Sequence, residues 1–379
     1  MPQSVLITGG AGFIGSRLAQ RFARAGHRVT VLDSLSPQVH GDDPANTSPL
    51  LASVLPVASV IQGSVTDIDA LAAALDGHEI VIHLAAETGT GQSMYEIDRY
   101  VDVNVGGTAK LLDIITNRST SVRRLVVASS RSIYGEGEYR DDDGATLYPA
   151  QRSDVHLAAG NFDVLDPATG EPLIMVPTRE TARLHPSSVY GITKQMQESL
   201  VMTVGAAIGL ESVALRYQNV YGPGQSLSNP YTGILSIFSS LIAQDKEINI
   251  FEDGLESRDF VYIDDVVDAT YLAATRSEAI GQVFNVGSGV ATTVEQVVEA
   301  LFAAYGRHVP TRVSGNYRLG DIRHNVADTS LIHDLLGFTP SISFEDGVKR
   351  FADWVATQPI AESGYERSLT EMSERKLLK

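Results

Sequence analysis

Residues 8 to 15 read Thr8-Gly9-Gly10-Ala11-Gly12-Phe13-Ile14-Gly15, and this stretch decides the fold. It follows an apolar run that predicts a strand, Ser4 to Thr8, and it opens a helical pattern, Phe13 to Ala25. A glycine-rich turn in that context lets backbone amides approach a pyrophosphate at the positive end of a helix dipole. The spacing is Gly-x-x-Gly-x-x-Gly, which departs from the standard fingerprint, but the strand and helix around it still predict a dinucleotide-binding turn.

Short apolar, β-branched runs alternate with helical patterns through the first half, which is typical of a parallel sheet with crossover helices. The expected strands are Ser4 to Thr8, Arg28 to Asp33, Ser59 to Gln62, Ile80 to Leu84, Arg124 to Ser129 and Ser212 to Tyr217. The expected helices are Phe13 to Ala25, Ile68 to Leu75, Tyr95 to Asn117, Ile234 to Ala243, Asp265 to Thr275, Thr293 to Tyr305 and Phe344 to Thr357. We predict an α/β fold, a Rossmann doubly wound parallel sheet with a smaller mixed α/β lobe that binds substrate.

The chain is expected to divide into two lobes and a tail. Residues 1–215 would form the dinucleotide-binding domain, with an insertion at 136–186 and a helix at 190–208. Residues 216–357 would form most of the second lobe, with some segments returning to the first. Residues 358–379 are polar and charged, so we expect a tail or a loosely docked helix.

The insertion at 136–186 contains several prolines and glycines and little periodicity. A loop that long fits two interpretations equally well, a lid beside the ligand or a disordered surface segment. Asp154, His156 and Asp163 lie within it without tight ligand spacing, which favours a solvated loop over a metal site. We therefore expect no metal.

Composition excludes several classes of protein. Of the 379 residues, 43% are hydrophobic and 20% charged, and no apolar run approaches the ~20 residues of a membrane helix. The N-terminal residues lack a basic segment followed by a long apolar stretch, so we expect a soluble, cytoplasmic protein with no membrane partner. Absence of cysteine excludes disulfides and a cysteine nucleophile, and a net charge of -17 argues against binding nucleic acid.

Two aspartates are candidates for the adenosine end of the cofactor. Asp33 ends the second expected strand, where a carboxylate would accept hydrogen bonds from ribose hydroxyls. Because this carboxylate would repel a 2′-phosphate, we expect NAD and not NADP, the alternative being a local cap. Asp67 could meet the adenine amino group, or it could cap the following helix.

Tyr190 and Lys194 are four residues apart in Ser-Ser-Val-Tyr-Gly-Ile-Thr-Lys, so one helical turn would place the phenol beside the ammonium. A nearby cation favours the phenolate, and we expect it to lower the pKa of Tyr190 from about 10. Ser129 and Ser130 lie at the carboxyl end of an expected strand, the edge where ligands bind in open α/β sheets. A hydroxyl there can polarise a substrate oxygen.

Seven segments occur in the order seen in extended short-chain dehydrogenases/reductases. They are the glycine turn, Asp33, His83-Leu84-Ala85-Ala86, Ser129-Ser130-Arg131-Ser132-Ile133-Tyr134-Gly135, Tyr190-x-x-x-Lys194, Arg216-Tyr217-Gln218-Asn219-Val220-Tyr221-Gly222-Pro223 and Arg258-Asp259-Phe260-Val261-Tyr262-Ile263-Asp264-Asp265. From residue 5 to about 350 the chain resembles the nucleotide-sugar epimerase/dehydratase branch. This resemblance implies NAD, oxidation of a sugar 4-hydroxyl to a transient 4-keto sugar, and return of the hydride. It also implies a homodimer formed by the helices at Tyr95 to Asn117 and Tyr190 to Ile208.

The resemblance assigns roles to individual residues. It implies that Ser130, Tyr190 and Lys194 are catalytic. The cofactor contacts that we expect are Gly9, Gly12, Phe13, Ile14, Gly15, Asp33, Ser64, Asp67, Leu84, Ala85, Ala86, Asn104, Ser129, Tyr190, Lys194, Tyr217 and Val220. The substrate contacts that we expect are Ser132, Tyr134, Asn219, Arg258, Arg318 and Asp321.

One departure from the family pattern distinguishes between reactions. Dehydratases of this branch carry Asp-Glu, and decarboxylases Ser-Glu, where this chain has Arg131-Ser132. The carboxylate needed for proton transfer at the neighbouring carbon is therefore missing, whereas epimerisation needs none. We expect an NAD-dependent nucleotide-sugar 4-epimerase acting on a dTDP- or UDP-(deoxy)hexose.

Two stretches narrow the resemblance further. Residues 131–140 and 225–231 are similar to dTDP-L-rhamnose 4-epimerases. One alternative is a decarboxylase or dehydratase that uses the same oxidation at C4. Another, of a different class, is a regulatory protein that binds NAD without turnover.

Overall fold

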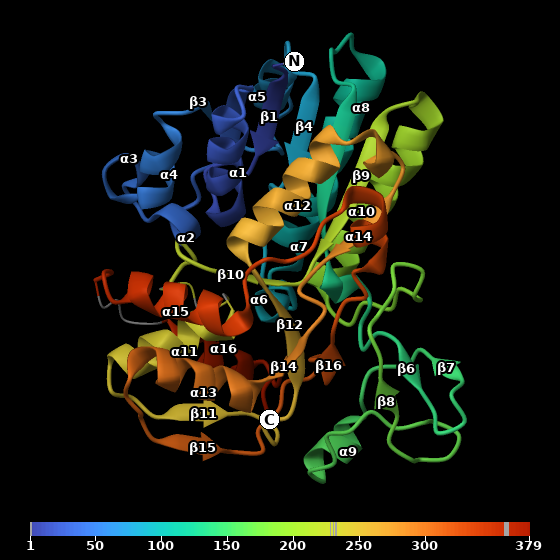
Figure 1. Ribbon diagram of the computed structural model, residues 1–379, viewed down its shortest axis with the longest axis vertical. Coiled ribbons are helices and arrows are strands. Elements are labelled where there is room, and N and C mark those ends of the chain that lie inside the picture. The colour runs from blue at the N-terminus through green and yellow to red at the C-terminus, as the bar shows by residue number, and fades with distance from the viewer. Residues whose placement is uncertain (1, 228, 230, 232, 360–363) are drawn as a thin grey trace.

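A computed structural model describes residues 2–227, 229, 231, 233–359 and 364–379 (Figure 1). Its centre is a seven-stranded sheet in the order β13-β9-β5-β4-β1-β2-β3, with every neighbouring pair parallel. The strands are β1 (Ser4–Thr8), β2 (Arg28–Asp33), β3 (Ser59–Gln62), β4 (Ile80–His83), β5 (Arg124–Ser130), β9 (Glu211–Tyr217) and β13 (Val283–Val286). The predicted Rossmann fold is confirmed.

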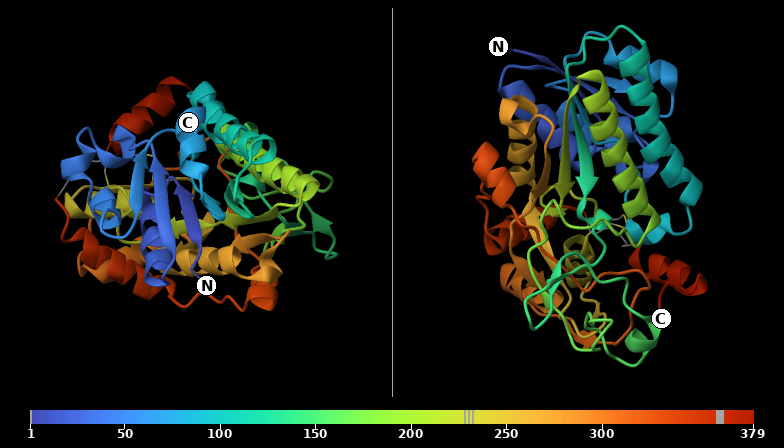
Figure 2. Two further views of the ribbon diagram at one scale, coloured as in Figure 1. Left: turned by 90° about the horizontal axis from the view of Figure 1, so that it is seen from above. Right: turned by 90° about the vertical axis from the view of Figure 1, so that its right-hand side faces the viewer.

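Helices cover both faces of this sheet (Figure 2). Val5 and Ile7 of β1 point into the core formed with α1 (Phe13–Arg24) and α12 (Ile263–Thr275). Leu6, between them, points into the opposite core, formed with α5 (Ile68–Leu75), α8 (Gly107–Asn117) and α10 (Val189–Ile208). Because both faces are buried, the strands are continuous apolar runs, which is why the sequence predicts them well.

The helix expected from Tyr95 to Asn117 runs without a gap from Ile97 to Asn117, but its middle is not α-helical. It consists of α7 (Ile97–Tyr100), a π-helical turn η1 (Val101–Gly106) and α8. A Cβ on Gly107 would lie 2.6 Å from Val65 Cγ2, so the helix approaches this neighbour closely. A π turn inserts a residue without breaking the apolar pattern, and such turns are frequent at functional sites.

The second lobe lies below the large sheet in Figure 1. Its strands are β10 (Asn219–Tyr221), β12 (Ser257–Tyr262), β14 (Ala291–Thr293) and β16 (His324–Asn325), with a separate pair β11 (Ile248–Ile250) and β15 (Thr311–Val313). Its helices are α11 (Ile234–Ala243), α13 (Val294–Tyr305), α15 (Phe344–Val355) and α16 (Tyr365–Glu374). As expected, segments return to the first lobe, because β13 pairs with β9 and α14 (Ser330–Leu336) packs on β13.

The insertion is ordered, so its interpretation as a disordered segment is wrong. It forms a small antiparallel sheet from β6 (Tyr139–Arg140), β7 (Thr146–Leu147) and β8 (Ile174–Met175), with α9 (Asp154–Ala158) beside it. Two-residue strands are too short to leave a periodic pattern in the sequence. In the described part of the chain, no group of three or more His, Cys, Asp or Glu side chains is placed to hold a metal.

The expected tail contains a docked helix. Tyr365 and Met372 of α16 are buried, and residues 377–379 pair backbone to backbone with residues 317–319. The remaining short elements are α2 (Pro37–His40), α3 (Pro44–Thr47), α4 (Pro49–Val54), α6 (Thr90–Ser93), η2 (Arg131–Ile133) and η3 (Ser277–Ala279). Ser228 and Pro230, within the expected turn and the stretch at 225–231, lie outside the described residues.

Among the described helices, none combines the length and the apolar character needed to cross a bilayer.

Candidate active site

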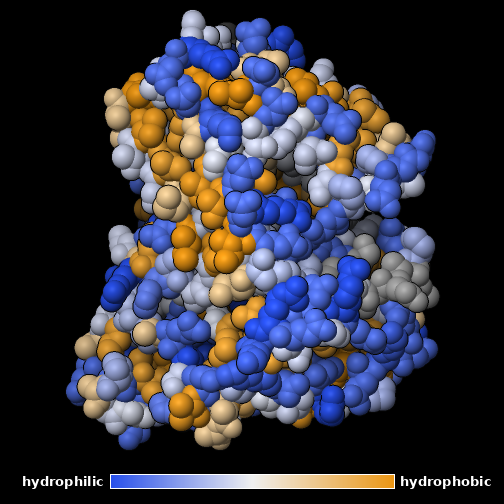
Figure 3. All heavy atoms as spheres, turned by 180° about the vertical axis from the view of Figure 1, so that it is seen from behind, coloured by the Kyte–Doolittle hydropathy of each residue, from blue (hydrophilic) through white to orange (hydrophobic). Residues whose placement is uncertain are grey.

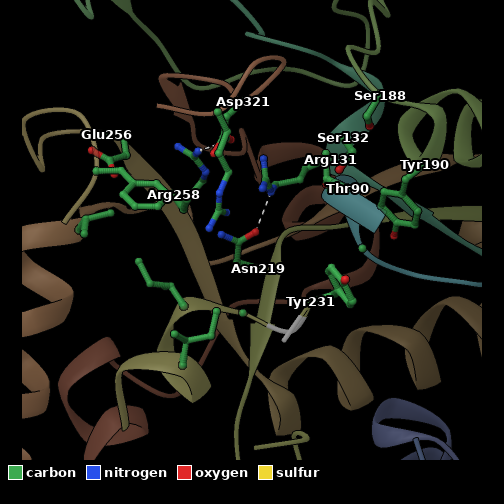
Figure 4. A pocket seen from close by; sticks show the side chains of 18 of the residues that line it. Thr90, Arg131, Ser132, Ser188, Tyr190, Asn219, Tyr231, Glu256, Arg258 and Asp321 are labelled. Carbon is green, nitrogen blue, oxygen red and sulfur yellow. Dashed lines mark hydrogen bonds and ion pairs between the residues drawn. The ribbon is translucent and has the colours of Figure 1, made fainter. Parts of the chain in front are cut away.

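A cavity of about 420 Å³ lies between the two lobes. The first lobe contributes Ser130, Arg131, Ser132 and Tyr190 to its wall, and the second contributes Asn219, Arg258, Arg318 and Asp321. Figure 4 shows the order along it, with Tyr190 and Ser132 at one end, Glu256 at the other, and Arg131, Asn219, Arg258 and Asp321 between them. Residues almost 200 positions apart in the sequence are thus brought together as predicted.

Ser130 and Tyr190 occupy the end of the cavity next to the large sheet. Ser130 is the last residue of β5, and its Oγ accepts a hydrogen bond from the Ser132 backbone N–H at 3.2 Å. Tyr190 lies in the first turn of α10, which begins where the Ser188 side chain accepts from the Gly191 N–H. The Tyr190 N–H donates to Ser93 Oγ at 3.0 Å, and the Tyr190 carbonyl accepts from Thr193 Oγ1 at 2.8 Å. Hydrogen bonds thus fix both polar groups of the tyrosine backbone.

The electrostatics of Tyr190 correct the sequence prediction. Burial raises the pKa of Tyr190 above its ordinary value, although a hydrogen bond from Ser130 and the charge of Arg131 act in the opposite direction. We expected Lys194 to lower this pKa. In the structure the Lys194 ammonium instead donates to Gln197 Oε1 at 2.8 Å, and burial lowers its own pKa to about 7.

A buried polar network that the sequence did not reveal supports Lys194. The Gln197 Oε1 accepts the hydrogen bond from Lys194, and the Gln197 Nε2 donates a hydrogen bond to Thr108 Oγ1 at 2.8 Å. Thr108 Oγ1 also meets His83 Nε2 at 3.0 Å, and burial followed by repulsion from Lys194 lowers the pKa of His83 to about 3. The His83 imidazole is therefore neutral, and it connects Thr8 to Thr108 by hydrogen bonds. Among the described residues Gln197 is the one hydrogen-bond acceptor for the Lys194 ammonium, so two of its three donors are available to a ligand.

Basic side chains lie along the middle of the cavity. Arg258 donates to Asp321 Oδ1 at 2.9 Å and to the carbonyls of Ser257, Ile322 and Arg323, which fixes its guanidinium. Burial pushes the pKa of Asp321 upward, but the charges of Arg258 and Arg318 hold it below its ordinary value. Arg318 lies over the Phe251 ring at 4.9 Å, and its buried Nε has no partner among the described residues.

The insertion stabilises the loop that carries Asp321. Arg152 donates to both oxygens of Glu252 at 2.8 Å and to the Asp321 carbonyl at 3.2 Å. Glu136, at the start of the insertion, accepts from the Arg323 N–H at 2.8 Å. The insertion therefore contacts this site from outside through buried ion pairs.

The glycine turn fits a dinucleotide. Gly9 has φ +68°, and a Cβ there would lie 2.8 Å from the Ala85 backbone nitrogen. A Cβ on Gly15 would lie 2.3 Å from the Gly9 carbonyl oxygen, so these positions require glycine. Gly12 immediately precedes α1, where the helix dipole favours an anion. Ser129, beyond this turn at the end of β5, has a buried Oγ without a partner among the described residues.

Asp33 both caps locally and has capacity for a ligand. Its oxygens accept from the Ala11 and Leu35 N–H groups at 2.9 Å each. A carboxylate has about four acceptor positions, so ribose hydroxyls would find unused ones. Asp67 caps α5 by accepting from Asp69 at 3.0 Å and Ala70 at 3.1 Å, which confirms the capping alternative.

Several residues that we expected to contact the cofactor make structural contacts with the rest of the chain. The Asn104 side chain connects Glu87 to Thr193 on α10 by hydrogen bonds of 2.7 to 3.1 Å. Ser64 bonds Thr66. Phe13, Ile14, Leu84 and Val220 pack against one core cluster and Ala85 against the other, while Ala86 is half-buried beyond β4.

Tyr134 and Tyr217 lie in the core. The Tyr134 hydroxyl donates to Asn285 Oδ1 at 2.7 Å and accepts from Arg216, and the Tyr217 hydroxyl meets Thr270 Oγ1 at 2.7 Å. Neither tyrosine lines the cavity. The predicted substrate contact of Tyr134 is therefore wrong, because its side chain points away from Ser132 into the protein.

Other residues on the cavity wall were not predicted. Thr90 of α6, Tyr231, Glu256, Met372 and Leu377 all contribute to it. Glu256 had a usable signal, since it precedes Arg258 by two positions and extended residues two apart share a face. Met372 and Leu377 carry no such signal, because only tertiary packing brings α16 and the residues after it to the cavity.

Comparison with known proteins identifies the family. The profile of the NAD dependent epimerase/dehydratase family matches residues 5–154 and 167–287. This chain belongs to that family. Two separated matches fit the structure, because residues 155–166 fall within the insertion.

Relatives of this epimerase/dehydratase-family protein cover nearly its full length. A dTDP-L-rhamnose 4-epimerase from Burkholderia thailandensis is 40% identical over 94% of this chain and 96% of its own. The UDP-glucose 4-epimerase of Thermotoga maritima, solved with UDP-glucose, has a TM-score of 0.73 at 29% identity, covering 93% and 98%. MoeE5, solved with UDP-glucuronic acid and NAD, has a TM-score of 0.72 at 28% identity, covering 93% and 99%. The predicted resemblance is confirmed.

Proposed function

We propose that this protein is an NAD-dependent nucleotide-sugar 4-epimerase. One observation carries the proposal: Ser130 and Tyr190 face a cavity whose lining carboxylates, Glu252, Glu256 and Asp321, all come from the second lobe. Figure 4 places Glu256 at the end opposite Tyr190. A base without a neighbouring carboxylate suits inversion at C4 and not elimination at the next carbon. The 40% identity to a dTDP-L-rhamnose 4-epimerase supports a dTDP- or UDP-(deoxy)hexose as substrate.

The NAD site would be formed by the glycine turn, Asp33, Ser129 and Lys194. These residues fit the cofactor because the turn accepts only glycine at positions 9 and 15 and because Ser129 and Lys194 have unused hydrogen-bonding capacity. Bound NAD would be the oxidant, because its nicotinamide can accept a hydride from C4 and return it. Asp33 favours NAD because its carboxylate would repel a 2′-phosphate.

Tyr190 moves the proton. In the phenolate form, which the Ser130 hydrogen bond and the Arg131 charge favour against the effect of burial, its oxygen accepts the proton of the C4 hydroxyl while the C4–H bond gives up its hydride, leaving a C4 carbonyl. Ser130 donates a hydrogen bond to that oxygen and thereby polarises it. After the keto sugar has turned, the hydride returns to the opposite face and Tyr190 returns the proton to oxygen. Atoms and electrons balance, and the product differs only in configuration at C4.

The test is direct observation of C4 inversion. Purified protein with NAD is incubated with dTDP-L-rhamnose, UDP-glucose and UDP-glucuronate, and the proton NMR coupling at C4 is followed. We expect inversion of at least one substrate, and a Tyr190→Phe variant should be slower by at least ~10²-fold. Release of carbon dioxide from UDP-glucuronate, or no inversion of any substrate, would contradict the proposal.

We also propose a homodimer formed through η1 and α10. These elements pack against each other, and their exposed side chains include Val101, Ile192 and Met196. An exposed apolar face on adjoining helices is what a second copy of the chain would cover. The cytoplasmic location and the domain boundaries stay predictions.

A further inference from the structure

Arg131 is a cation with unused hydrogen-bonding capacity at the centre of the cavity. Its Nε donates to Asn219 Oδ1 at 2.6 Å, and among the described residues this is the one hydrogen bond its side chain makes. A guanidinium has five donors, so four stay available. Burial and repulsion from Arg258 lower the pKa of Arg131 to about 10, which leaves it charged at neutral pH.

The charges along the middle of the cavity do not balance. Among the described residues along this part of the wall, Arg131, Arg258 and Arg318 face one carboxylate, Asp321, which leaves an excess of two positive charges. Glu252 adds nothing to this count, because Arg152 and Arg323 pair with it. In a chain of net charge -17, such a local excess points to an anionic ligand.

Glu256 offsets this excess only in part. It lies at the far end of the cavity in Figure 4, and burial raises its pKa to about 7. The diphosphate of a nucleotide sugar carries two ionised oxygens, which matches the surplus of the arginines. The ligand class implied by charge is therefore the class that the proposed function requires.

The position of Arg131 selects one of the two phosphates. It follows Ser130 directly in the chain, and Figure 4 places its guanidinium between the Tyr190 end and the Arg258–Asp321 pair. A nucleotide sugar extended along the cavity with its sugar at Tyr190 would bring the sugar-linked phosphate to Arg131 first. Arg258 and Arg318 would meet the rest of the diphosphate.

We propose that Arg131 is a substrate-binding residue that holds the sugar-linked phosphate. This inference rests on the proposed function. On binding, the guanidinium adds a charge-assisted contact to a phosphate oxygen while Asn219 orients it from the other side. Such an anchor has a mechanistic use, because hydride returns to the opposite face only if the sugar turns while its phosphate stays in place.

Calorimetric titration of the NAD-loaded protein with dTDP, UDP and dTMP tests this without turnover. Arg131→Met should weaken dTDP and UDP binding about 10- to 100-fold, since a charged hydrogen-bonded contact is lost. Binding of dTMP, which lacks the second phosphate, should change less than about 3-fold. Arg131→Lys should recover part of the affinity, because it restores the charge without the planar fork. Arg312→Met, which removes an exposed arginine paired with Glu247, is the matched control and should change nothing.

Three outcomes would overturn the inference. Equal weakening of dTMP and dTDP would mean that Arg131 merely shapes the cavity through Asn219. Unchanged dTDP affinity with a lowered melting temperature would mean a structural role. Unchanged dTDP affinity with selective loss of UDP-glucuronate binding would assign Arg131 to a sugar carboxylate. If dTDP binding depends on Arg131 while no sugar is inverted at C4, the phosphate site stands and the epimerase proposal fails.

Discussion

At the residue scale, Lys194 is the group whose charge the fold alters most usefully. Burial lowers its pKa to about 7, against about 10.4 for an unfolded lysine. Between these two pH values the unfolded chain binds more protons than the folded chain. The free energy of unfolding therefore rises with pH between about pH 7 and pH 10. Below about pH 7 the lysine is charged in both states and its burial is unfavourable.

Lys194→Met should therefore be more stable than the wild type at pH 6. Its advantage should shrink as the pH rises from about 7 towards 10, because the wild-type lysine becomes neutral when folded. Urea unfolding at several pH values measures this, with Lys349→Met, at an exposed position, as the control. A pH-independent difference would contradict the prediction. The variant should also lose epimerase activity, because Lys194 is proposed to contact the cofactor.

Asp33 gives a second prediction at this scale. Asp33→Asn removes the charge that would repel a 2′-phosphate and disturbs the bond to the Ala11 N–H. We expect NADH affinity to fall about 10-fold and discrimination against NADPH to weaken, as fluorescence titration would show. Asp42→Asn, at an exposed position between α2 and α3, is the control and should preserve both affinities. An unchanged NADH to NADPH ratio would assign Asp33 to local capping alone.

Residue chemistry could be predicted where it depends on a short motif. Ser130, Tyr190 and Arg258 all line one cavity, as the sequence indicated. The direction of a side chain was harder to predict: Tyr134 lies two residues beyond Ser132, yet it points into the core. The altered pKa of Tyr190 was also out of reach, because it depends on burial and on where the Lys194 ammonium finds a partner.

At the element scale, the C-terminal segment 364–379, which we call the C-terminal strap, closes one side of the cavity. Tyr317 and Lys379 exchange backbone hydrogen bonds of 2.9 and 3.0 Å, and the Leu319 N–H donates to the Leu377 carbonyl at 3.0 Å. Arg318 lies within this pairing. Within α16, Glu371 accepts hydrogen bonds from the hydroxyls of Tyr95 and Tyr231 at 2.9 Å each.

Deleting residues 376–379 should loosen the loop that holds Arg318. We expect KM for the nucleotide sugar to rise about 10-fold with kcat within about 2-fold, because the proton-transfer residues are untouched. Steady-state measurement of C4 inversion checks this. Lys379→Ala is a matched control, since it removes the ion pair with Asp154 but keeps the backbone pairing. An unchanged KM in the deletion would show that the strap does not support the site.

Elements were predictable in proportion to their length and burial. The strands of the large sheet other than β13, which the sequence did not predict, and helices such as α5 appear within one residue of their expected bounds, because a buried parallel strand has a continuous apolar pattern. The π turn η1 and the two-residue strands of the insertion were missed, since neither changes a pattern over a window long enough to read. The sequence left open whether the strap is a tail or a loosely docked helix, and its docking position could not be predicted because its partners Tyr95, Tyr231 and Tyr317 are distant in sequence.

At the scale of the whole molecule, one face of the described part of the chain exposes apolar side chains on two adjoining helices. Ile192 and Met196 are 49% and 45% exposed on α10, and Val101 on the adjoining η1 is 43% exposed. Ile192 and Met196 are four residues apart and share a helix face. Seen from behind, apolar side chains gather in a band over the lobe that holds the large sheet (Figure 3).

A second copy of the chain meeting this face through the same helices would bury these side chains in a four-helix interface. Ile192→Asp combined with Met196→Asp would place two charges there, so the variant should be monomeric when light scattering measures its mass after gel filtration. Ile174→Asp is the matched control: Ile174 is 55% exposed, but it lies on β8 in the insertion, and this variant should stay dimeric. Because η1 braces the loop after β4 through Asn104, loss of the dimer should also lower activity at unchanged dTDP affinity. A wild-type protein that is monomeric at micromolar concentration would contradict the prediction outright.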